Sequence, residues 1–173
     1  MVLEGGEFRL RAFRISDAPA LALHANNRKI WRNLRNLLPR PYTLGSAEAW
    51  IEQMSVSDPL RHGFVIDIDG ALAGAMGYTL EDDVHTGDAT IGYWLGEPYW
   101  GRGIATEAVR LLTDHAFRTH KLRRAEARVY AWNPASVRVL EKAGYVLEGR
   151  LRNAVEKDGE VTDELVYGYV RAG

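Results

Sequence analysis

The stretch from Gly92 to Leu112, GYWLGEPYWGRGIATEAVRLL, passes from an apolar run through a glycine-rich turn into a helical pattern. From Gly103 to about Thr119, apolar side chains recur at the spacing of one helix face. The unpaired backbone N–H groups at the start of such a helix attract anions, helped by the helix dipole. Gly101 and Gly103 carry no Cβ, so a phosphate can approach the backbone closely. The stretch therefore predicts a strand, a turn and a helix with an anion site between them.

The glycine pattern narrows the class of phosphate ligand. GRGIAT lacks the Lys-Ser/Thr pair of a P-loop, which argues against nucleotide hydrolysis. It also lacks the three-glycine dinucleotide fingerprint with its acidic residue further along the chain. On spacing alone, the glycines could equally be turn residues of a nucleotide-binding or purely structural domain.

The remaining pattern predicts a single domain over residues 1–173 with an α/β (α+β) fold, one sheet and helices on its faces. Asp69-Gly70 is a hairpin dipeptide between two strands, and Thr43 or Ser46 is expected to cap a helix. The apolar run at 89–96 predicts a strand buried on both faces. Strands are expected over 8–13, 63–68, 71–80, 89–96, 123–133, 145–155 and 164–172, and helices over 16–24, 46–54, 103–119 and 133–143.

Composition excludes several classes of function. The net charge of -1 gives no general attraction to nucleic acid or to a membrane. The absence of cysteine removes disulfides, thiolate metal sites and cysteine nucleophiles, and it fits a reducing compartment. The first residues contain no apolar signal region, and no apolar run approaches the length of a membrane span. A cytoplasmic protein without nucleic-acid or membrane partners is expected.

Five segments together resemble one family. WGRGIA resembles the coenzyme A pyrophosphate loop of the GCN5-related N-acetyltransferases (GNAT), whose Gln/Arg-x-x-Gly-x-Gly/Ala pattern is met by Gly103 and Ala105. Trp100 stands where the family usually has Gln or Arg, a departure typical of the RimJ/RimL-like branch. IGYWL, NPASVRVLEKAGYVLEGRLR, LRAFRISDAPALA and PYTLGSAEAWI extend the similarity over nearly the whole chain. The resemblance implies a mixed, mostly antiparallel sheet that splays between its fourth and fifth strands, here 89–96 and 125–133, with helices on both faces.

The resemblance also implies acetyl-CoA as the donor and no metal. The pantetheine arm would pair with an unpaired strand edge, as an added strand does. A backbone N–H near the thioester would stabilise the developing oxyanion. The residues expected at the donor are Tyr93, Trp94, Leu95, Trp100, Gly101, Arg102, Gly103, Ile104, Ala105, Thr106, Asn133 and Ser136.

The acid and the base depart from the family pattern. Leu140 occupies the position of the tyrosine that protonates the leaving thiolate in many relatives, so Ser136 is expected to serve instead. Alternatively, Asn133 and Ser136 only begin a helix. Thr90 occupies the position of the relatives' glutamate base, and Asp88 lies on the same strand face. Asp88 is the candidate base. Alternatively, Asp88 is only a charged turn residue, and either a water chain takes the proton or the amine arrives unprotonated.

The segment 26–40 is basic and predicts the acceptor side. Trp31, Arg32 and Arg35 would favour an amine with nearby carboxylates, such as an acidic peptide N-terminus; a solvated helix face is the commoner alternative. The expected function is acetyl transfer from acetyl-CoA to a primary amine, such as a protein N-terminal amine, directly within a ternary complex. The alternative is a non-catalytic acyl-CoA-binding module. The identity of the amine, the strictness for acetyl and a homodimer contact through the C-terminal hairpin stay open.

Overall fold

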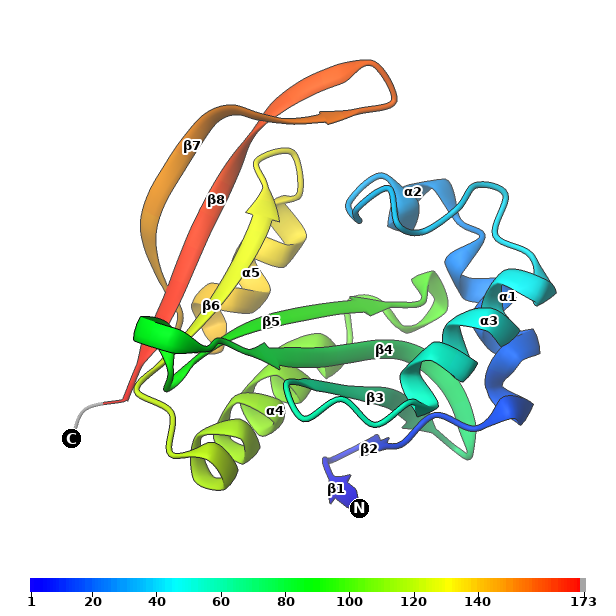
Figure 1. Cartoon of the computed structure of the whole chain (residues 1–173). Helices are drawn as coiled ribbons and strands as arrows, with labels where there is room; N and C mark the ends of the chain where they lie inside the picture. Colours follow the sequence, from blue (N-terminus) through cyan, green and yellow to red (C-terminus); the bar gives the residue numbers. More distant parts are fainter. Residues whose placement is uncertain (172–173) are drawn as a thin grey trace.

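The computed structural model describes residues 1–171 of the 173-residue chain as one eight-stranded sheet with helices on its faces (Figure 1). The strand order is β1-β2-β3-β4-β5-β6-β8-β7, and within the described residues the one parallel pair is β5 with β6. The strands are β1 (Val2–Glu4), β2 (Arg9–Arg11), β3 (Arg61–Ile68), β4 (Ala71–Leu80), β5 (Asp88–Leu95), β6 (Arg124–Tyr130), β7 (Val146–Lys157) and β8 (Glu160–Val170). The helices are α1 (Ala18–Ala25), α2 (Arg28–Trp31), α3 (Leu44–Ser55), α4 (Ile104–His120) and α5 (Pro134–Lys142).

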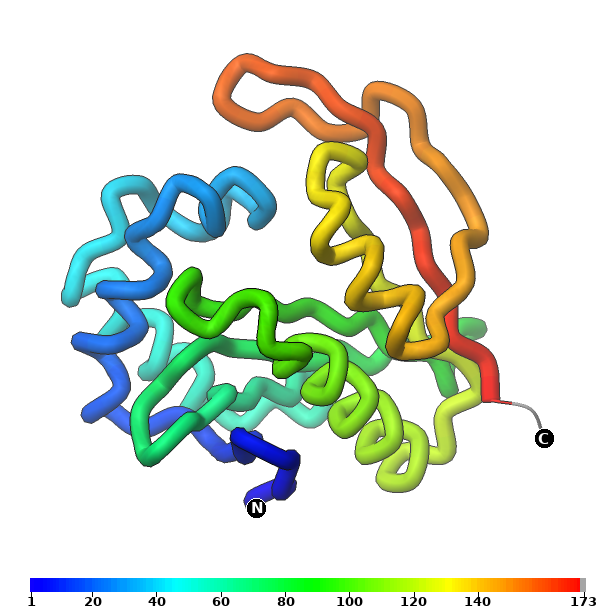
Figure 2. Tube along the Cα trace, turned by 180° about the vertical axis from the view of Figure 1, so that it is seen from behind, coloured from blue at the N-terminus to red at the C-terminus, as the bar shows by residue number. Residues whose placement is uncertain are grey.

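Both faces of the sheet are covered, as the alternation of side chains along a strand requires. Val65 and Leu72 pack with α1 and α3 in one buried cluster. The neighbouring residues Phe64 and Ile66 point to the other face and pack with α4 in a second cluster. Seen from behind, α4 crosses the central strands and α5 lies beside it (Figure 2). The predicted α/β architecture with helices on both faces is confirmed.

The sheet opens between β5 and β6. These strands pair at only three positions, from Asp88 with Arg124 to Thr90 with Glu126. On its other side, β5 stays paired with β4 as far as Leu95. The expected splay is therefore confirmed, and the edge of β5 beyond Thr90 is left without a strand partner in the described part of the chain.

The prediction that β5 is buried on both faces is wrong. Ile91 and Leu95 are buried in the core beneath α4. Thr90 and Trp94 are only partly buried, and Gly92 is exposed. The reason is the splay, because this strand face borders an opening instead of a helix layer.

Local signals explain most of the element boundaries. Asp69 and Gly70 both have positive φ angles, 52° and 86°, as the predicted hairpin turn requires. Thr43 caps α3 by accepting a hydrogen bond from the Ser46 N–H at 3.1 Å. The short strand β1 was not predicted, and the last predicted strand is observed as far as Val170. Ala172, which was included in that strand, lies outside the described residues.

Candidate active site

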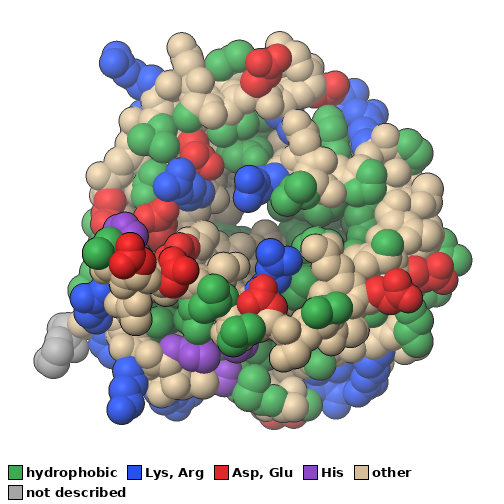
Figure 3. Space-filling view, viewed as in Figure 1, with side chains coloured by type: hydrophobic (Ala, Val, Ile, Leu, Met, Phe, Trp, Pro, Cys, Tyr) green, Lys and Arg blue, Asp and Glu red, His purple; other side chains and the backbone are tan. Residues whose placement is uncertain are grey.

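The opening between β5 and β6 is a cleft of about 2170 Å³. Its walls come from the splayed strands β5 and β6, the starts of α4 and α5 and the segment that follows α2, and the cleft continues along α3, β3, β4 and the end of β7. A space-filling view shows the molecule hollowed at its centre, with Lys and Arg side chains around the opening (Figure 3). The splay thus produces a large concave feature, which is the usual kind of place for a ligand.

A bridge crosses the cleft from one side to the other. It consists of residues 28–40 after α1 and of residues 157–160 at the tip of the β7–β8 hairpin. Lys157 Nζ donates hydrogen bonds to the Leu34 carbonyl at 2.8 Å and to Asn36 Oδ1 at 3.0 Å. The same ammonium lies 3.7 Å from the ring centroid of Trp31, a cation–π contact. The bridge therefore turns the cleft into a covered passage.

The N-terminus of α4 forms one end of this passage. Gly103 is its N-cap residue, with φ at 77° and no side-chain cap, and Gly101 has φ at 75°. Residues other than glycine rarely adopt such angles. A Cβ on either glycine would meet no protein atom within 4 Å, so the space beside both is open. The first-turn N–H groups of α4 are therefore accessible to an anionic group, as the sequence predicted.

Most residues expected around this loop line the cleft, namely Trp100, Gly101, Gly103, Ile104, Ala105 and Thr106. Arg102 does not, because its guanidinium forms an ion pair with Glu7 at 3.0 Å. Sequence reasoning missed Arg138 and Lys142, which line the cleft from α5. Within residues 1–171, neither has a carboxylate partner within ion-pair distance, so both are available to a phosphate. Their i, i+4 spacing on one helix face was the signal that could have found them.

The open edge of β5 carries Tyr93, Trp94 and Leu95, all of which line the cleft. The indole N–H of Trp100 donates to the Leu95 carbonyl at 2.7 Å and so fixes the loop against the strand. An extended arm with amide groups can pair with the rest of this edge as an added strand would.

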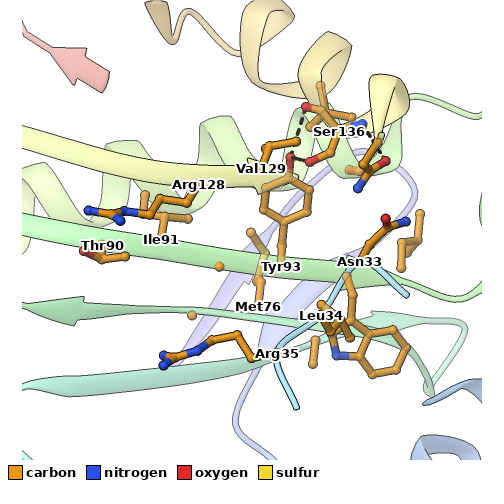
Figure 4. Close-up of a pocket in the computed structure, with 18 of the residues that line it drawn as sticks. Asn33, Leu34, Arg35, Met76, Thr90, Ile91, Tyr93, Arg128, Val129 and Ser136 are labelled. Carbon is orange, nitrogen blue, oxygen red and sulfur yellow. Dashed lines mark hydrogen bonds between the residues drawn. The ribbon is translucent and has the colours of Figure 1, made fainter. Parts of the chain in front are cut away.

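Ser136 and Tyr93 meet across the splay, where the hydroxyl oxygens lie 2.6 Å apart (Figure 4). Asn133 is the N-cap of α5 and accepts a hydrogen bond from the Ser136 N–H at 3.3 Å. Burial raises the pKa of Tyr93 to about 12, although the hydrogen bond with Ser136 acts in the opposite direction. Leu140 is fully buried in the core, so no acid is present at that position.

Five carboxylates line the cleft, namely Glu81, Asp88, Glu126, Glu156 and Glu164, and the first three lie beside the paired part of β5 and β6. Asp88 is at the closed end of the splay, 3.6 Å from Arg123 and 3.8 Å from His85. Glu81 accepts a hydrogen bond of 2.9 Å from the hydroxyl of Thr90, which places it beside β5 further toward the opening. Burial alone would raise the pKa of Glu126, but hydrogen bonds from Arg128 and Arg124 hold it below its usual range.

The expected acceptor residues separate into two groups. Arg35 lines the cleft and has no ion-pair partner within residues 1–171. Arg32 also lines the cleft, but its guanidinium stacks 4.5 Å from the Trp132 ring centroid and pairs with Glu160 at 3.6 Å. Trp31 packs beneath Lys157 and is not among the lining residues. In Figure 4, Arg35 and Arg128 lie on opposite sides of the cleft.

Comparisons with known proteins agree with this geometry. The model of the acetyltransferase (GNAT) domain family matches residues 7–146. The chain is 32% identical over 173 residues to YjcK of Bacillus subtilis, named a probable N-acetyltransferase, with 95% of this chain and 94% of that protein covered. It is 33% identical over 91 residues to the ribosomal-protein-serine acetyltransferase of Escherichia coli, which covers 53% of this chain and 50% of that protein.

Solved structures show the same fold. RimJ of Mycobacterium smegmatis in complex with CoA-disulfide has a TM-score of 0.86 at 26% identity, covering 98% of this chain and 86% of that chain. RimL, a ribosomal L7/L12 alpha-N-protein acetyltransferase in complex with coenzyme A, has a TM-score of 0.86 at 23% identity and 98% coverage of both chains.

The chain belongs to the GNAT acetyltransferase family and resembles its RimJ/RimL-like branch. As a member of this family it is an N-acetyltransferase that takes its acetyl group from acetyl-CoA. Within the described residues, no group of His, Cys, Asp and Glu has a metal-binding arrangement. None of the helices in that part of the chain is long and apolar enough to cross a membrane.

Proposed function

We propose that the protein acetylates a primary amine, in particular a protein N-terminal amine, by direct transfer within a ternary complex. The observation that carries this proposal is the covered passage, because it can receive the donor at the α4 end and a slender amine beneath the bridge. The similarity to the E. coli ribosomal-protein-serine acetyltransferase supports a protein as the acceptor. The lack of cysteine is consistent with action in the cytoplasm.

At the donor end, we assign the pyrophosphate to the first-turn N–H groups of α4 and to the glycines before them. Arg138 and Lys142 add positive charge from α5. The pantetheine arm lies along the edge of β5 at Tyr93, Trp94 and Leu95, with Asn133 on the facing side. The fit is good because the glycine loop leaves open space where any Cβ would stand.

For the chemistry, Ser136 is the proposed acid that protonates the leaving thiolate. Asp88 was the base expected from the sequence, but its ion pair with Arg123 lies at the closed end of the splay. Glu81 is a second candidate, because Thr90 holds its carboxylate beside the open part of β5. The two assignments are distinguished by the dependence of the transfer rate on pH. If Glu81 takes the amine proton, Glu81→Gln shifts this pH profile to more alkaline values. If Asp88 takes the proton, Asp88→Asn produces that shift instead.

On the acceptor side, Arg35 is the proposed selector. Its guanidinium has no carboxylate partner within the described residues and faces a covered passage, so it favours an amine that carries a carboxylate nearby. Arg32 stacks on Trp132, and these two side chains shape the wall beside Arg35. The indole N–H of Trp132 donates to Asn33 Oδ1 at 3.1 Å, which fixes the ring against the bridge.

The experiment is an acetyl-transfer assay on peptides that differ only in whether acidic or neutral residues follow the N-terminal amine. The proposal predicts a preference for the acidic peptide that Arg35→Gln removes, and equal rates on both peptides would contradict the assignment of Arg35. The alternative, a non-catalytic acyl-CoA-binding module, predicts donor binding without turnover on any amine.

A homodimer contact is also part of the proposal. β7 is an edge strand of the sheet, and Val146, Leu147 and Leu151 are exposed on it. Exposed apolar edges of this kind pair readily with another strand. Light scattering of the purified protein tests the contact, with a monomer as the contradicting result.

A further inference from the structure

The contact between Tyr93 and Ser136 joins the two sides of the splay at the proposed reaction site. Tyr93 is held by β5, whose backbone pairs with Met76 of β4 at this position. Ser136 is held in the first turn of α5 by its N–H bond to Asn133. Both residues line the cleft, and their hydroxyl oxygens are 2.6 Å apart.

We propose that Tyr93 is a positioning residue for acetyl transfer, because its hydroxyl donates to Ser136 Oγ and directs the Ser136 proton toward the leaving sulfur. This inference rests on the proposed function. The Tyr93 phenol would then act from β5. This strand lies on the opposite side of the cleft from the α5 position at which many relatives carry their tyrosine.

Either hydroxyl can donate in this contact, and the proposal assigns the donor role to Tyr93 because two acceptors lie within its reach. The Tyr93 hydroxyl reaches two acceptors, Ser136 Oγ at 2.6 Å and the Ser136 carbonyl at 3.4 Å, and both belong to the same residue. With the phenol proton directed at Ser136, the serine proton is free to point into the cleft. The raised pKa of Tyr93, about 12, keeps the phenol protonated at ordinary assay pH.

The protons and electrons balance in the transfer. The amine nitrogen donates its lone pair to the thioester carbonyl carbon, and the carbon–sulfur bond breaks with its electron pair on sulfur. Ser136 gives its proton to that sulfur and takes the Tyr93 proton in exchange. The acceptor nitrogen loses one proton to water or to a nearby carboxylate, and water returns a proton to Tyr93. The products are the acetylated amine and the free thiol.

The test compares Tyr93→Phe with a matched control, Tyr145→Phe. Tyr145 is buried, whereas Tyr93 is partly buried. Like Tyr93, Tyr145 shares a hydrogen bond with a hydroxyl, that of Thr113 at 2.8 Å, but it does not line the cleft. Removing a general acid lowers the reaction rate about 10²–10⁴-fold. Because Tyr93→Phe keeps Ser136 in place, we expect a smaller loss, with kcat falling about tenfold to 100-fold. The KM for acetyl-CoA should stay within about twofold of the wild type. Tyr145→Phe should lower the melting temperature and leave kcat unchanged.

A double-mutant cycle completes the test. If Tyr93 acts through Ser136, the double variant Tyr93→Phe/Ser136→Ala should lose no more activity than Ser136→Ala alone. If the loss of activity in the double variant were instead the product of the losses in the two single variants, the positioning role would be wrong. A Tyr93→Phe variant with wild-type kcat would also overturn it. If the wild-type protein acetylated no amine, the proposed function itself would be wrong. That result differs from an active enzyme in which Tyr93→Phe has no effect, so failure of the inference and failure of the proposed function are distinguishable.

Discussion

Gly103→Leu gives the sharpest prediction, because the structure separates its effect on folding from its effect on the donor. A Cβ at Gly103 would meet no protein atom within 4 Å, so the substitution causes no clash in the folded chain. Its folding cost comes from φ at 77°, which costs a residue other than glycine about 1–2 kcal/mol. For a chain of this length, that corresponds to a fall in melting temperature of about 2–8 °C.

The larger effect should be on donor binding. A ligand present at 100 times its Kd stabilises the native state by about 2.7 kcal/mol, which raises the melting temperature by about 5–11 °C. The Gly103→Leu side chain would stand in the open space assigned to the pyrophosphate, so this rise should disappear. Differential scanning fluorimetry with and without acetyl-CoA measures both quantities.

Gly70→Leu is the matched control. Gly70 also has a positive φ, 86°, and open space at its Cβ position, but it lies in the β3–β4 turn and does not line the cleft. It should show the same loss of stability with the full donor-induced rise. A full rise in Gly103→Leu would refute the placement of the pyrophosphate at the α4 loop.

Two further predictions concern the bridge and the histidines. Lys157→Met leaves the carbonyl of Leu34 and the amide oxygen of Asn36 without their charged donor, so unfolding should require about 1.5–3 kcal/mol less free energy. Chemical denaturation measures this, and unchanged stability would contradict the role of the bridge. Burial lowers the pKa of His115 and of His120. The free energy of unfolding should therefore be highest above about pH 6.5 and should decrease as the pH falls below that value. The reason is that the unfolded chain then binds more protons than the folded chain. The melting temperature should decrease with falling pH in the same way, and His115→Gln should make this decrease smaller. An unchanged dependence on pH would contradict the contribution assigned to His115.

The sequence predicted the fold where local signals and the resemblance coincide. The Asp69-Gly70 turn, the cap at Thr43 and the glycine before α4 each require a particular backbone, and the structure has that backbone at each. The splay was expected only through the resemblance. Periodicity alone gave the opposite prediction for β5, because an apolar run does not reveal whether its second face meets a helix or an opening.

The site was predicted less completely, because its contacts join residues far apart in the chain. Tyr93 was expected at the donor for its backbone, whereas the structure shows its hydroxyl at Ser136. The bridge depends on Lys157 meeting the segment after α2, a contact between residues 123 positions apart. No local pattern records such a pairing, so Trp31 was predicted as an acceptor residue and is found beneath that lysine.

The most direct test of the account is the release of coenzyme A thiol by the wild-type protein with acetyl-CoA and a panel of amines. The chain has no cysteine, so a thiol reagent reports only the product. The account predicts thiol release that depends on the amine and falls about 100-fold or more in Ser136→Ala, as loss of a general acid should cause. Donor binding without thiol release on any amine of the panel would contradict catalysis and favour a binding module.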